Sequence, residues 1–307
     1  MENTKKTAAA LGFFDGLHIG HKAVIRTAAA AGQRLGISVS VLTFRGFPDL
    51  PKFGGRRDMC LMTYEDKKEL LSVWGADNVF AYEFADIRNM SPEEFFEDIV
   101  IRKMNAAFVC CGGDFRFGKG GRGDVALLSG LCERHGTGFE IVPPEKDRSG
   151  VPISSSHIRE LIRDGNVSEA FRQLGQWYSL TLPVQHGREL GRTMGFPTIN
   201  QVIPDYMVHP KRGVYASLVE VPGETAEFPA ITDIGIKPTV DSNGSEVMET
   251  HIIGYTGDLY GKTVRVKLHK FIRPEQKFSS LDDLQKQLIS DKNTAQNIFS
   301  ERIKSLS

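Results

Sequence analysis

The feature that most constrains this chain is a change of pattern near residue 178. Up to about residue 145, short apolar runs alternate with amphipathic segments, as in repeated strand–helix units. Beyond residue 178, short β-rich runs are separated by turns that contain proline and glycine. Two such patterns within 307 residues predict two domains, which we place at residues 1–177 and 178–307.

The first pattern predicts a parallel, doubly wound sheet, because strands that are separated by helices pair in parallel. Its strand candidates are residues 7–14, 38–44, 78–84, 106–111 and 138–144. Its helix candidates are residues 21–35, 64–75, 91–104 and 124–136. Ser91, followed by Pro92 and two glutamates, marks a strong helix start. Ligands of such a sheet are expected beyond the carboxyl ends of its strands.

The second pattern predicts an antiparallel β-barrel. Its strand candidates are residues 178–187, 213–221, 228–236, 248–255 and 263–271. One or two helices are expected before it, over residues 154–177. Leucines at helical spacing, Leu281, Leu284 and Leu288, predict a helix at the end of the chain.

Charge and hydropathy exclude several classes of partner. The 38 Lys and Arg residues balance 38 Asp and Glu residues, so no net field draws the chain to nucleic acid or to an anionic membrane. No apolar stretch has the length of a transmembrane helix. We therefore expect small-molecule substrates, no nucleic-acid or membrane partner, and a monomer or weak homo-oligomer.

The N-terminal segment and the cysteines indicate a cytoplasmic protein. Lys5 and Lys6 precede a short apolar run, as in a secretory signal, but the run passes into Asp15 without a cleavage region, which favours a buried strand. The four cysteines show neither a C-x-x-C pair nor the spacing of metal ligands, so we expect reduced core residues. They are Cys60, Cys110, Cys111 and Cys132.

The stretch LGFFDGLHIGH places His18 and His21 three residues apart behind a glycine-bearing turn. Gly12 allows close approach of a ligand to the backbone, and a helix that begins near Gly20 offers free N–H groups and brings both imidazoles to one side of its first turn. A lone histidine is more often structural, but this pair predicts a phosphate site in which imidazoles donate hydrogen bonds.

This H-x-G-H arrangement resembles the nucleotidyltransferase superfamily, whose members have a Rossmann-like domain and transfer nucleotidyl groups from triphosphates. ISSSHIR, residues 153–159, resembles the late I-S-S-T-x-I-R motif of that superfamily. The resemblance implies catalytic roles for His18, His21 and Arg159. The nucleotide-binding residues that it implies are Gly12, Phe13, Asp15, Gly20, Ser155 and Ser156. Without the first motif, the second would be interpreted as a helix cap with a surface arginine.

GGDFRFG, residues 112–118, resembles a loop of the flavin-adenylylating members of that superfamily. The resemblance implies flavin contacts for Asp114 and Phe115, although packing is the commoner role for phenylalanine. The following GKGGRG formally spells G-x-G-x-x-G, but it does not directly follow a strand, so we reject a dinucleotide fingerprint.

GRELGRTMGFPTIN, residues 187–200, combines glycines that permit close approach of phosphates with oxygen ligands suited to Mg²⁺. It resembles the riboflavin kinase pattern G-R-x-x-G-x-P-T-A-N. The resemblance implies metal ligation by Thr198 and Asn200. The nucleotide-binding residues that it implies are Gly191, Arg192, Gly195 and Thr198. A turn rich in Gly and Pro is the alternative, but it explains only the glycines.

METHI, residues 248–252, resembles the kinase segment that contains the general base, and the match implies this role for Glu249. IRPEQKF, residues 272–278, resembles a later kinase segment. Arg273 in this segment is a candidate for flavin or nucleotide contact, and a surface salt bridge is the alternative.

Together the two halves resemble the bacterial bifunctional riboflavin kinase/FMN adenylyltransferase family. The resemblance implies that ATP phosphorylates riboflavin to FMN, and that a second ATP adenylylates FMN to FAD with release of pyrophosphate, both with Mg²⁺. Two departures stand out: FRGFP, residues 44–48, has Phe47 where the family has histidine in F-x-P-H-P, and Asp233 replaces a frequent asparagine. A kinase with a degenerate or re-purposed first domain, and a non-catalytic flavin-binding or regulatory protein, remain alternatives.

Overall fold

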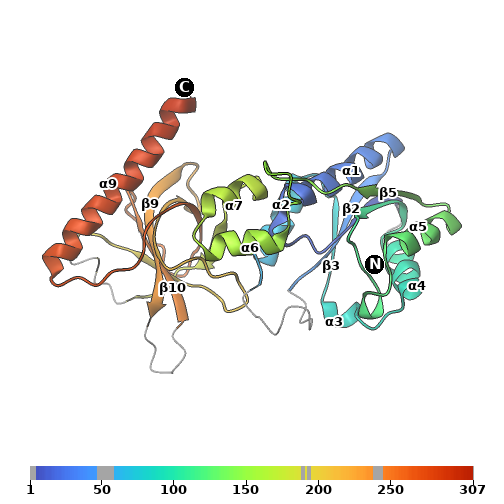
Figure 1. Cartoon of the computed structure of the whole chain (residues 1–307), viewed down its shortest axis with the longest axis horizontal. Helices are drawn as coiled ribbons and strands as arrows, with labels where there is room; N and C mark the ends of the chain where they lie inside the picture. The colour runs from blue at the N-terminus through green and yellow to red at the C-terminus, as the bar shows by residue number, and fades with distance from the viewer. Residues whose placement is uncertain (1–4, 47–58, 188–190, 192–194, 238–244, 307) are drawn as a thin grey trace. The chain divides into compact units, whose positions relative to one another are not determined.

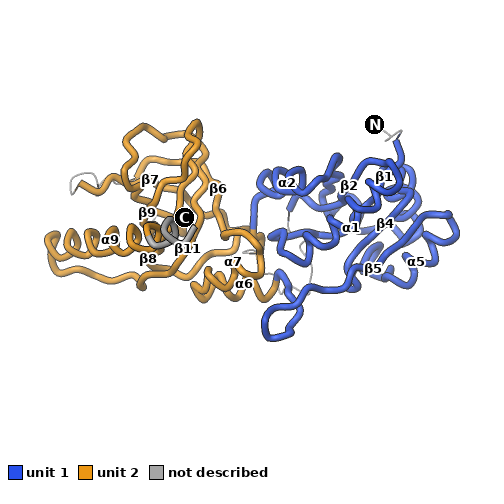
Figure 2. The backbone as a smooth tube through the Cα atoms, turned by 90° about the horizontal axis from the view of Figure 1, so that it is seen from above, with its two compact units in different colours: residues 1–56, 62–155 blue, residues 57–61, 156–307 orange. Residues whose placement is uncertain are grey.

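The computed structural model describes residues 5–46, 59–187, 191, 195–237 and 245–306 (Figure 1). The chain forms two compact units, coloured separately in Figure 2. The first consists of residues 1–56 and 62–155, and the second of residues 57–61 and 156–307. Each unit has its own sheet, so each is described by itself.

The first unit contains the predicted parallel sheet, with strand order β3-β2-β1-β4-β5. Its strands are β1 (Thr7–Leu11), β2 (Ser38–Phe44), β3 (Asn78–Tyr82), β4 (Ala106–Gly112) and β5 (Gly138–Val142). Its helices are α1 (Ile19–Leu35), α2 (Tyr64–Val73), α3 (Phe84–Ile87), α4 (Pro92–Glu94), η3 (Phe95–Lys103) and α5 (Val125–Arg134), with short turns η1 (Asp15–Leu17) and η4 (Lys119–Gly121). All five predicted strands and their order along the chain are confirmed.

The central strand β1 shows why the sheet carries helices on both faces. Its alanines are completely buried, and successive side chains of a strand point to opposite faces. Ala8 and Ala10 pack in the core under α1 and α2, whereas Ala9 and Leu11 pack in the core under η3 and α5. Small side chains at the centre let both layers of helices approach the sheet closely.

The predicted helix over residues 91–104 begins as expected but changes its hydrogen bonding. Ser91 and Glu94 form a reciprocal capping box at the start of α4. The helix then continues as the wider π-helix η3, in which Met104 donates its N–H to the carbonyl of Ile99, five residues earlier.

The second unit contains six antiparallel strands in the order β6-β11-β8-β9-β10-β7. They are β6 (Ser179–Pro183), β7 (Ile199–Val202), β8 (Gly213–Glu220), β9 (Glu227–Lys237), β10 (Ser245–Ile252) and β11 (Thr263–Arg273). The two edge strands approach each other, since Gln185, just beyond β6, bridges Asn200 of β7. The predicted barrel is therefore confirmed as nearly closed.

Hydrogen bonds between side chains inside this barrel tie neighbouring strands together. The hydroxyl groups of Ser217, Thr232 and Thr250 form a chain with O–O distances of 2.6 and 3.0 Å. Gln201 of β7 donates to the carbonyl groups of Leu182 on β6 and Val264 on β11. Buried hydrogen bonds between side chains and neighbouring strands favour one strand arrangement over others.

The helices of the second unit whose bounds lie in the described part of the chain are α6 (Ser155–Arg163, from its second residue), α7 (Val167–Leu174) and the terminal helix α9 (Leu281–Leu306). The long helix α9 lies along the outer face of the barrel (Figures 1 and 2). Ala295 and Phe299 of α9 pack there against Ala216 of β8 and Ile231 of β9. The terminal helix is thus confirmed, although Leu281 at its start is exposed.

The compact units divide between Ser155 and Ser156. The domain boundary between residues 177 and 178 stays a prediction. The helices before the barrel associate with it: Ser168 of α7 donates a hydrogen bond to the carbonyl of His269, and Trp177 stacks on the His269 ring at 3.8 Å. The change of sequence pattern near residue 178 thus marks where the strands begin, whereas packing against the barrel already begins in the helices before it.

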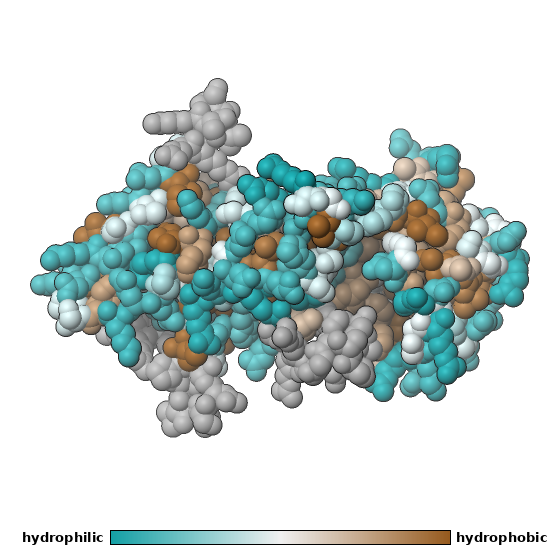
Figure 3. Space-filling model, viewed as in Figure 1, coloured by the Kyte–Doolittle hydropathy of each residue, from teal (hydrophilic) through white to brown (hydrophobic). Residues whose placement is uncertain are grey.

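The surface and the cysteines agree with the sequence analysis. On the face in Figure 3, hydrophobic residues occur in small groups among hydrophilic ones. Within the described ranges, no helix combines the length and the apolar character needed to cross a bilayer. All four cysteines are buried and free, as predicted. The pKa of Cys111 is raised to about 12 and that of Cys132 to about 11, and burial is the main cause of both shifts. These thiols are therefore protonated at neutral pH.

Candidate active sites

The histidine motif forms a strained loop between β1 and α1. Gly16 has a φ of 75°, and two residues with side chains, Phe14 and Leu17, have φ values of 54° and 43°. Such residues rarely adopt this left-handed region, and buried examples concentrate at functional sites. Phe14 and Leu17 are both buried in the core that α1 covers, so their packing helps to hold the loop.

His18 and His21 lie on one side of the first turn of α1, as predicted. Their rings are stacked with centroids 3.5 Å apart and an angle of 20° between the planes. The Nδ1 atom of His18 caps the helix by accepting the N–H of His21 at 3.3 Å. Because Nδ1 is an acceptor, neutral His18 carries its hydrogen on Nε2, which is then the atom that can donate to a ligand.

Gly12 and Gly20 make room for side chains of the motif itself. A Cβ at Gly12 would lie 2.7 Å from the ring of Phe14, and one at Gly20 would lie 3.1 Å from the ring of His18. The structure thus gives both glycines a packing reason. Their contact with a nucleotide stays a prediction.

Residues of both predicted nucleotide motifs meet at one hydrogen bond within the first unit. Ser155, at the start of α6, donates its hydroxyl to the backbone carbonyl of Asp15 at 3.0 Å. Asp15 is buried in the loop that carries the histidines. Two segments separated by 140 positions are therefore joined at the carboxyl end of β1.

The remaining residues of the second motif have different surroundings. Ser156 is exposed, whereas Arg159 is only 4% exposed and donates from Nε to the carbonyl of Met59 at 2.7 Å. Arg159 is thus not the plain surface arginine of the alternative interpretation. Its predicted action on phosphate stays a prediction.

The loop after β4 separates its aromatic residues into two environments. Phe117 is buried and stacks with Phe115 at a centroid distance of 5.8 Å, and it also contacts Phe95 at 5.4 Å. Phe115 is half-buried against the same core, and Asp114 is exposed. Packing explains Phe117 fully and Phe115 in part, so flavin contact remains a prediction for Asp114 and for the open side of Phe115.

A backbone hydrogen bond joins two described residues of the kinase-like motif before β7. Phe196 donates its N–H to the carbonyl of Gly191 at 2.8 Å, and a side chain at Gly191 would collide with the Phe196 carbonyl oxygen. Gly195 has a φ of 77°, which glycine adopts without strain. Thr198 is half-buried. Arg192, which we predicted to bind nucleotide, lies outside the described residues.

Cross-strand pairing places one polar residue of this motif in a row with polar residues of two other strands. Asn200 of β7 pairs with Glu249 of β10, and Glu249 pairs with Asp233 of β9. Directly opposed residues of antiparallel strands point to the same face, with Cβ atoms about 4.5–5.5 Å apart. Their neighbours Met248 and Thr250 are fully buried in the barrel, so the row faces outward, on the side that α9 partly covers.

Asp233 has an unusual charge environment within this row. Desolvation by surrounding atoms, followed by repulsion from the carboxylate of Glu275, raises its pKa to about 6. Arg273 opposes this shift, while Glu249 and Asp291 add to it. The position where the family often has asparagine therefore carries a carboxyl group that titrates close to neutral pH.

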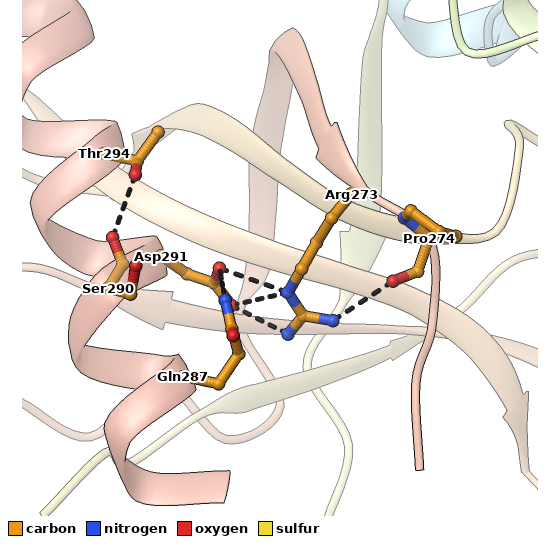
Figure 4. A network of polar contacts seen from close by, with 6 residues as sticks. All are labelled: Arg273, Pro274, Gln287, Ser290, Asp291 and Thr294. Carbon is orange, nitrogen blue, oxygen red and sulfur yellow. Dashed lines mark hydrogen bonds and ion pairs between the residues drawn. The ribbon is translucent and has the colours of Figure 1, made fainter. Parts of the chain in front are cut away.

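Arg273 is held by α9, as Figure 4 shows. Its Nε and Nη2 atoms donate to the carboxylate of Asp291 at 2.7–3.1 Å, and Nη1 donates to the carbonyl of Pro274. Gln287 supports the same carboxylate at 2.8 Å. The side chains of Arg273 and Asp291 are 16% and 2% exposed. The salt bridge that we considered as the alternative is thus present, but nearly buried, and flavin contact stays a prediction.

The sequence analysis missed β7, and with it the row of polar side chains. The sequence analysis places residues 199 and 200 in the motif of residues 187–200, which is rich in Gly and Pro, and assigns no strand at residues 199–202. Its burial pattern, two buried residues between two partly buried ones, does not alternate, so the sequence carries no periodic signal for this four-residue strand.

Comparisons with known proteins agree with this division of the chain. A family model described as FAD synthetase matches residues 1–157, and one described as riboflavin kinase matches residues 174–299. The bifunctional riboflavin kinase/FMN adenylyltransferase of Escherichia coli (strain K12) is 35% identical over 292 residues, which are 94% of this chain and 91% of that protein. This chain belongs to that bifunctional family.

Other members of the bifunctional riboflavin kinase/FMN adenylyltransferase family match at similar length. The Bacillus subtilis (strain 168) enzyme is 32% identical and covers 97% of this chain and 94% of its own. A crystal structure described as a macrolide-efflux protein from Streptococcus pneumoniae has a TM-score of 0.83 and 30% identity, with 96% of each chain covered. The fold is therefore shared over both units.

The departures from the family pattern fall at different places in the structure. Gly46 is described, and among the described residues a Cβ added to it would have no atom within 4 Å, but Phe47 lies outside the described residues. Asp233, by contrast, lies in the polar row beside Glu249. In this member of the bifunctional family, the kinase-side departure is thus the one with a defined geometry.

Proposed function

We propose that this chain phosphorylates riboflavin to FMN in its second unit and adenylylates FMN to FAD in its first. The observation that carries the proposal is the register that brings Asn200 of the kinase motif opposite Glu249 of β10. The two residues are 49 positions apart in the chain, and neither motif alone predicts their pairing. The match of a separate family model to each half supports the two activities.

In the kinase reaction, the ribityl 5′-hydroxyl oxygen attacks the γ-phosphorus of ATP. The bond from that phosphorus to the bridging oxygen of ADP breaks, and the carboxylate of Glu249 accepts the hydroxyl proton. Glu249 is half-buried on β10. A rigid strand therefore fixes the base relative to the loop that precedes β7.

The oxygen atoms near Glu249 fit a hard divalent cation. Thr198, directly before β7, supplies a hydroxyl group, and Asn200 of β7 supplies an amide oxygen. Asn200 is nearly buried, and its amide fills the space that a side chain at Gly187 would take, so its position is fixed. We propose that these two residues hold Mg²⁺, which would neutralise charge on the phosphates of ATP.

In the adenylyl transfer, a phosphate oxygen of FMN attacks the α-phosphorus of ATP, and pyrophosphate leaves. Negative charge on the phosphates is stabilised by hydrogen bonds from His18 and His21 and by the N-terminal end of α1. The stacked imidazoles and the cap at His18 hold both rings at this helix end. Arg159 is proposed from the sequence motif to add a cationic contact.

The other proposed contacts follow from the motifs and their neighbours. Glycines and hydroxyl residues of the two nucleotide loops bind phosphates, and Asp114, Phe115 and Arg273 contact flavin. Both reactions consume ATP, which fits a cytoplasmic enzyme. Balanced charge fits small-molecule substrates, and we propose no nucleic-acid partner and a monomer or weak homo-oligomer.

A single assay tests the proposal. Purified protein is incubated with riboflavin, ATP and Mg²⁺, and riboflavin, FMN and FAD are separated by chromatography over time. We expect FMN to rise first and FAD to follow. FMN without FAD would instead support a kinase with a degenerate or re-purposed first domain, and unchanged riboflavin would support a non-catalytic flavin-binding protein.

A further inference from the structure

A buried lysine lies directly beneath the histidine loop. Lys67 of α2 is only 4% exposed. Its Nζ atom lies 3.3 Å from the carbonyl oxygen of Phe13, 3.1 Å from that of Phe44 and 3.4 Å from the hydroxyl of Thr43. The amino group of a lysine side chain donates hydrogen bonds, and all three oxygens can accept them.

The three oxygens lie at functionally important ends of the central strands. Phe13 follows β1, whereas Thr43 and Phe44 end β2. The carboxyl ends of adjacent parallel strands are the edge at which such sheets bind ligands. Lys67 therefore joins two strands on the side where the histidine loop begins.

Lys67 acts on the peptide that enters the strained part of the loop. The carbonyl of Phe13 accepts hydrogen bonds from Lys67 and, at 2.7 Å, from the hydroxyl of Thr43. The next residue, Phe14, has the left-handed φ of 54°. Because a peptide group is planar, fixing its carbonyl also fixes the N–H of Phe14 on the opposite edge. Strained backbone persists only where its surroundings determine it strongly.

A purely structural role explains this arrangement less well. Taking an ammonium group out of water is unfavourable, and an apolar residue would fill a buried position of α2 at lower cost. Lys67 also lies 4.8 Å from the centroid of the Phe13 ring, so both the ring and the carbonyl of that residue face the cation. Two of the contacts of Lys67, to the ring and to the carbonyl of Phe13, are thus made with one residue of the loop, next to its strained backbone.

We propose that Lys67 is a positioning residue for adenylyl transfer. It holds the Phe13–Phe14 peptide so that the loop keeps its left-handed turn and presents His18, His21 and the first N–H groups of α1 to the triphosphate. This inference rests on the proposed site in the first unit, and it adds a residue that neither nucleotide motif contains.

The test compares Lys67→Met with Lys68→Met in the full chain. Methionine keeps the length and apolar stem of lysine but removes its charge and hydrogen bonds. Lys68 is the next residue of α2 and is exposed, so it provides a matched control. FMN and ATP are supplied, formation of FAD is followed, and kcat is determined separately from the KM for ATP. Kinase activity of the same preparations shows whether the second unit remains functional.

We expect Lys67→Met to lower kcat for adenylyl transfer about 100-fold, with a much smaller change in KM, because misplacement of the loop weakens stabilisation of the transition state. Kinase kcat and the Lys68→Met variant stay close to wild type. Hydrogen exchange of the amides of residues 12–18 becomes faster in Lys67→Met only. This second measurement detects positioning independently of activity.

Several results would overturn the inference. Adenylyl transfer within about threefold of wild type would do so, as would a loss of activity with unchanged exchange at residues 12–18. If Lys67→Met does not fold, Lys67→Gln is measured in the same way and must show the same two effects. Wild-type protein run in parallel separates the cases, because absence of FAD from wild type contradicts the proposed function and not the role of Lys67.

Discussion

The two units assemble their candidate sites in different ways. In the first unit, His18 and His21 come from one loop and one helix turn, so neighbours in the chain are neighbours in space. In the second unit, Asn200, Glu249 and Asp233 come from three strands and meet through their register. A local site is visible in a short motif, whereas a register-built site depends on the whole barrel. The two sites should therefore fail in different ways when residues are changed.

The largest expected effect separates the two reactions from the kinase side. Glu249→Gln removes the proposed base but keeps the size of the side chain, so we expect kinase kcat to fall about 1,000-fold. Adenylylation of supplied FMN should be unchanged. Initial rates measured by chromatography test this, with Glu227→Gln, an exposed carboxylate at the start of β9, as the control. Loss of both reactions in Glu249→Gln with an intact fold would contradict separate sites.

The reverse separation is expected from the histidine loop. His21→Ala removes one hydrogen-bond donor to developing phosphate charge, and we expect adenylyl transfer to fall about 100-fold. Riboflavin phosphorylation should continue at the wild-type rate. His135→Ala is the matched control, since His135 lies at the C-terminal end of α5 and pairs with Glu97. An unchanged rate of FAD formation in His21→Ala would remove this residue from the site.

The third prediction concerns stability rather than chemistry, and it tests how far the second site depends on long-range contacts. Asp291→Asn leaves the nearly buried guanidinium of Arg273 without its counterion, so we expect a loss of about 3 kcal/mol from the free energy of unfolding. Asp282→Asn, at the exposed start of α9, should lose far less.

The two tryptophans of the chain allow this measurement in each unit separately. Trp74 belongs to the first unit and Trp177 to the second. In a Trp74→Phe background, urea unfolding followed by Trp177 fluorescence reports the second unit alone. If Asp291→Asn and Asp282→Asn shift that transition equally, the ion pair does not stabilise the barrel as proposed.

The smallest expected effect depends on pH. The pKa of Asp233 rises from its ordinary value of 3.8 to about 6 in the folded chain. Between about pH 4 and 6 the folded state therefore binds more protons than the unfolded state, so stability from this group decreases as pH rises through that window. Asp233→Asn should raise the Tm of the second unit above pH 6 and leave it unchanged near pH 4.

The measurement is a series of thermal unfolding curves at several pH values, again with Trp177 as the reporter. Although neighbouring atoms desolvate the carboxyl group of Asp233, the residue as a whole is exposed to water, so screening should make the shift in Tm smaller than that of Asp291→Asn. A Tm difference that is the same at pH 4 and pH 8 would mean that the aspartate carboxyl group does not titrate in this window.

The sequence predicted the architecture well where patterns are local and repeated. The alternation of strands and helices correctly gave the five strands of the parallel sheet and their order along the chain, and the capping residues correctly gave the start of α4. The spacing of His18 and His21 also correctly placed both rings on one side of a helix turn. These features depend on the periodicity of a single segment, which a sequence displays directly.

Features that depend on distant partners could not be predicted in this way. The strand β7 is too short to show a period, and its pairing with β10 is what brings Asn200 to Glu249. Lysine on an amphipathic helix is normally exposed, so nothing in YEDKKELL distinguishes buried Lys67 from exposed Lys68. Likewise, Arg273 gives no sign in sequence of its partner Asp291, which lies on α9.

One short segment makes this chain harder to divide into two independent fragments than the separate matches of the two family models suggest. Residues 59–61 precede β3, β4 and β5 of the parallel sheet in sequence but belong to the barrel unit. There the N–H groups of Met59 and Cys60 donate hydrogen bonds to the carbonyl of Tyr206, and the N–H of Val208 donates one to the carbonyl of Cys60. A fragment that starts at α6 lacks Met59 and Cys60. Tyr206, Val208 and the Nε atom of Arg159 would then lose the hydrogen bonds that they make with these two residues. Separating the two halves at the start of α6 would therefore remove these hydrogen bonds, and an isolated kinase half would need other hydrogen-bond partners in their place.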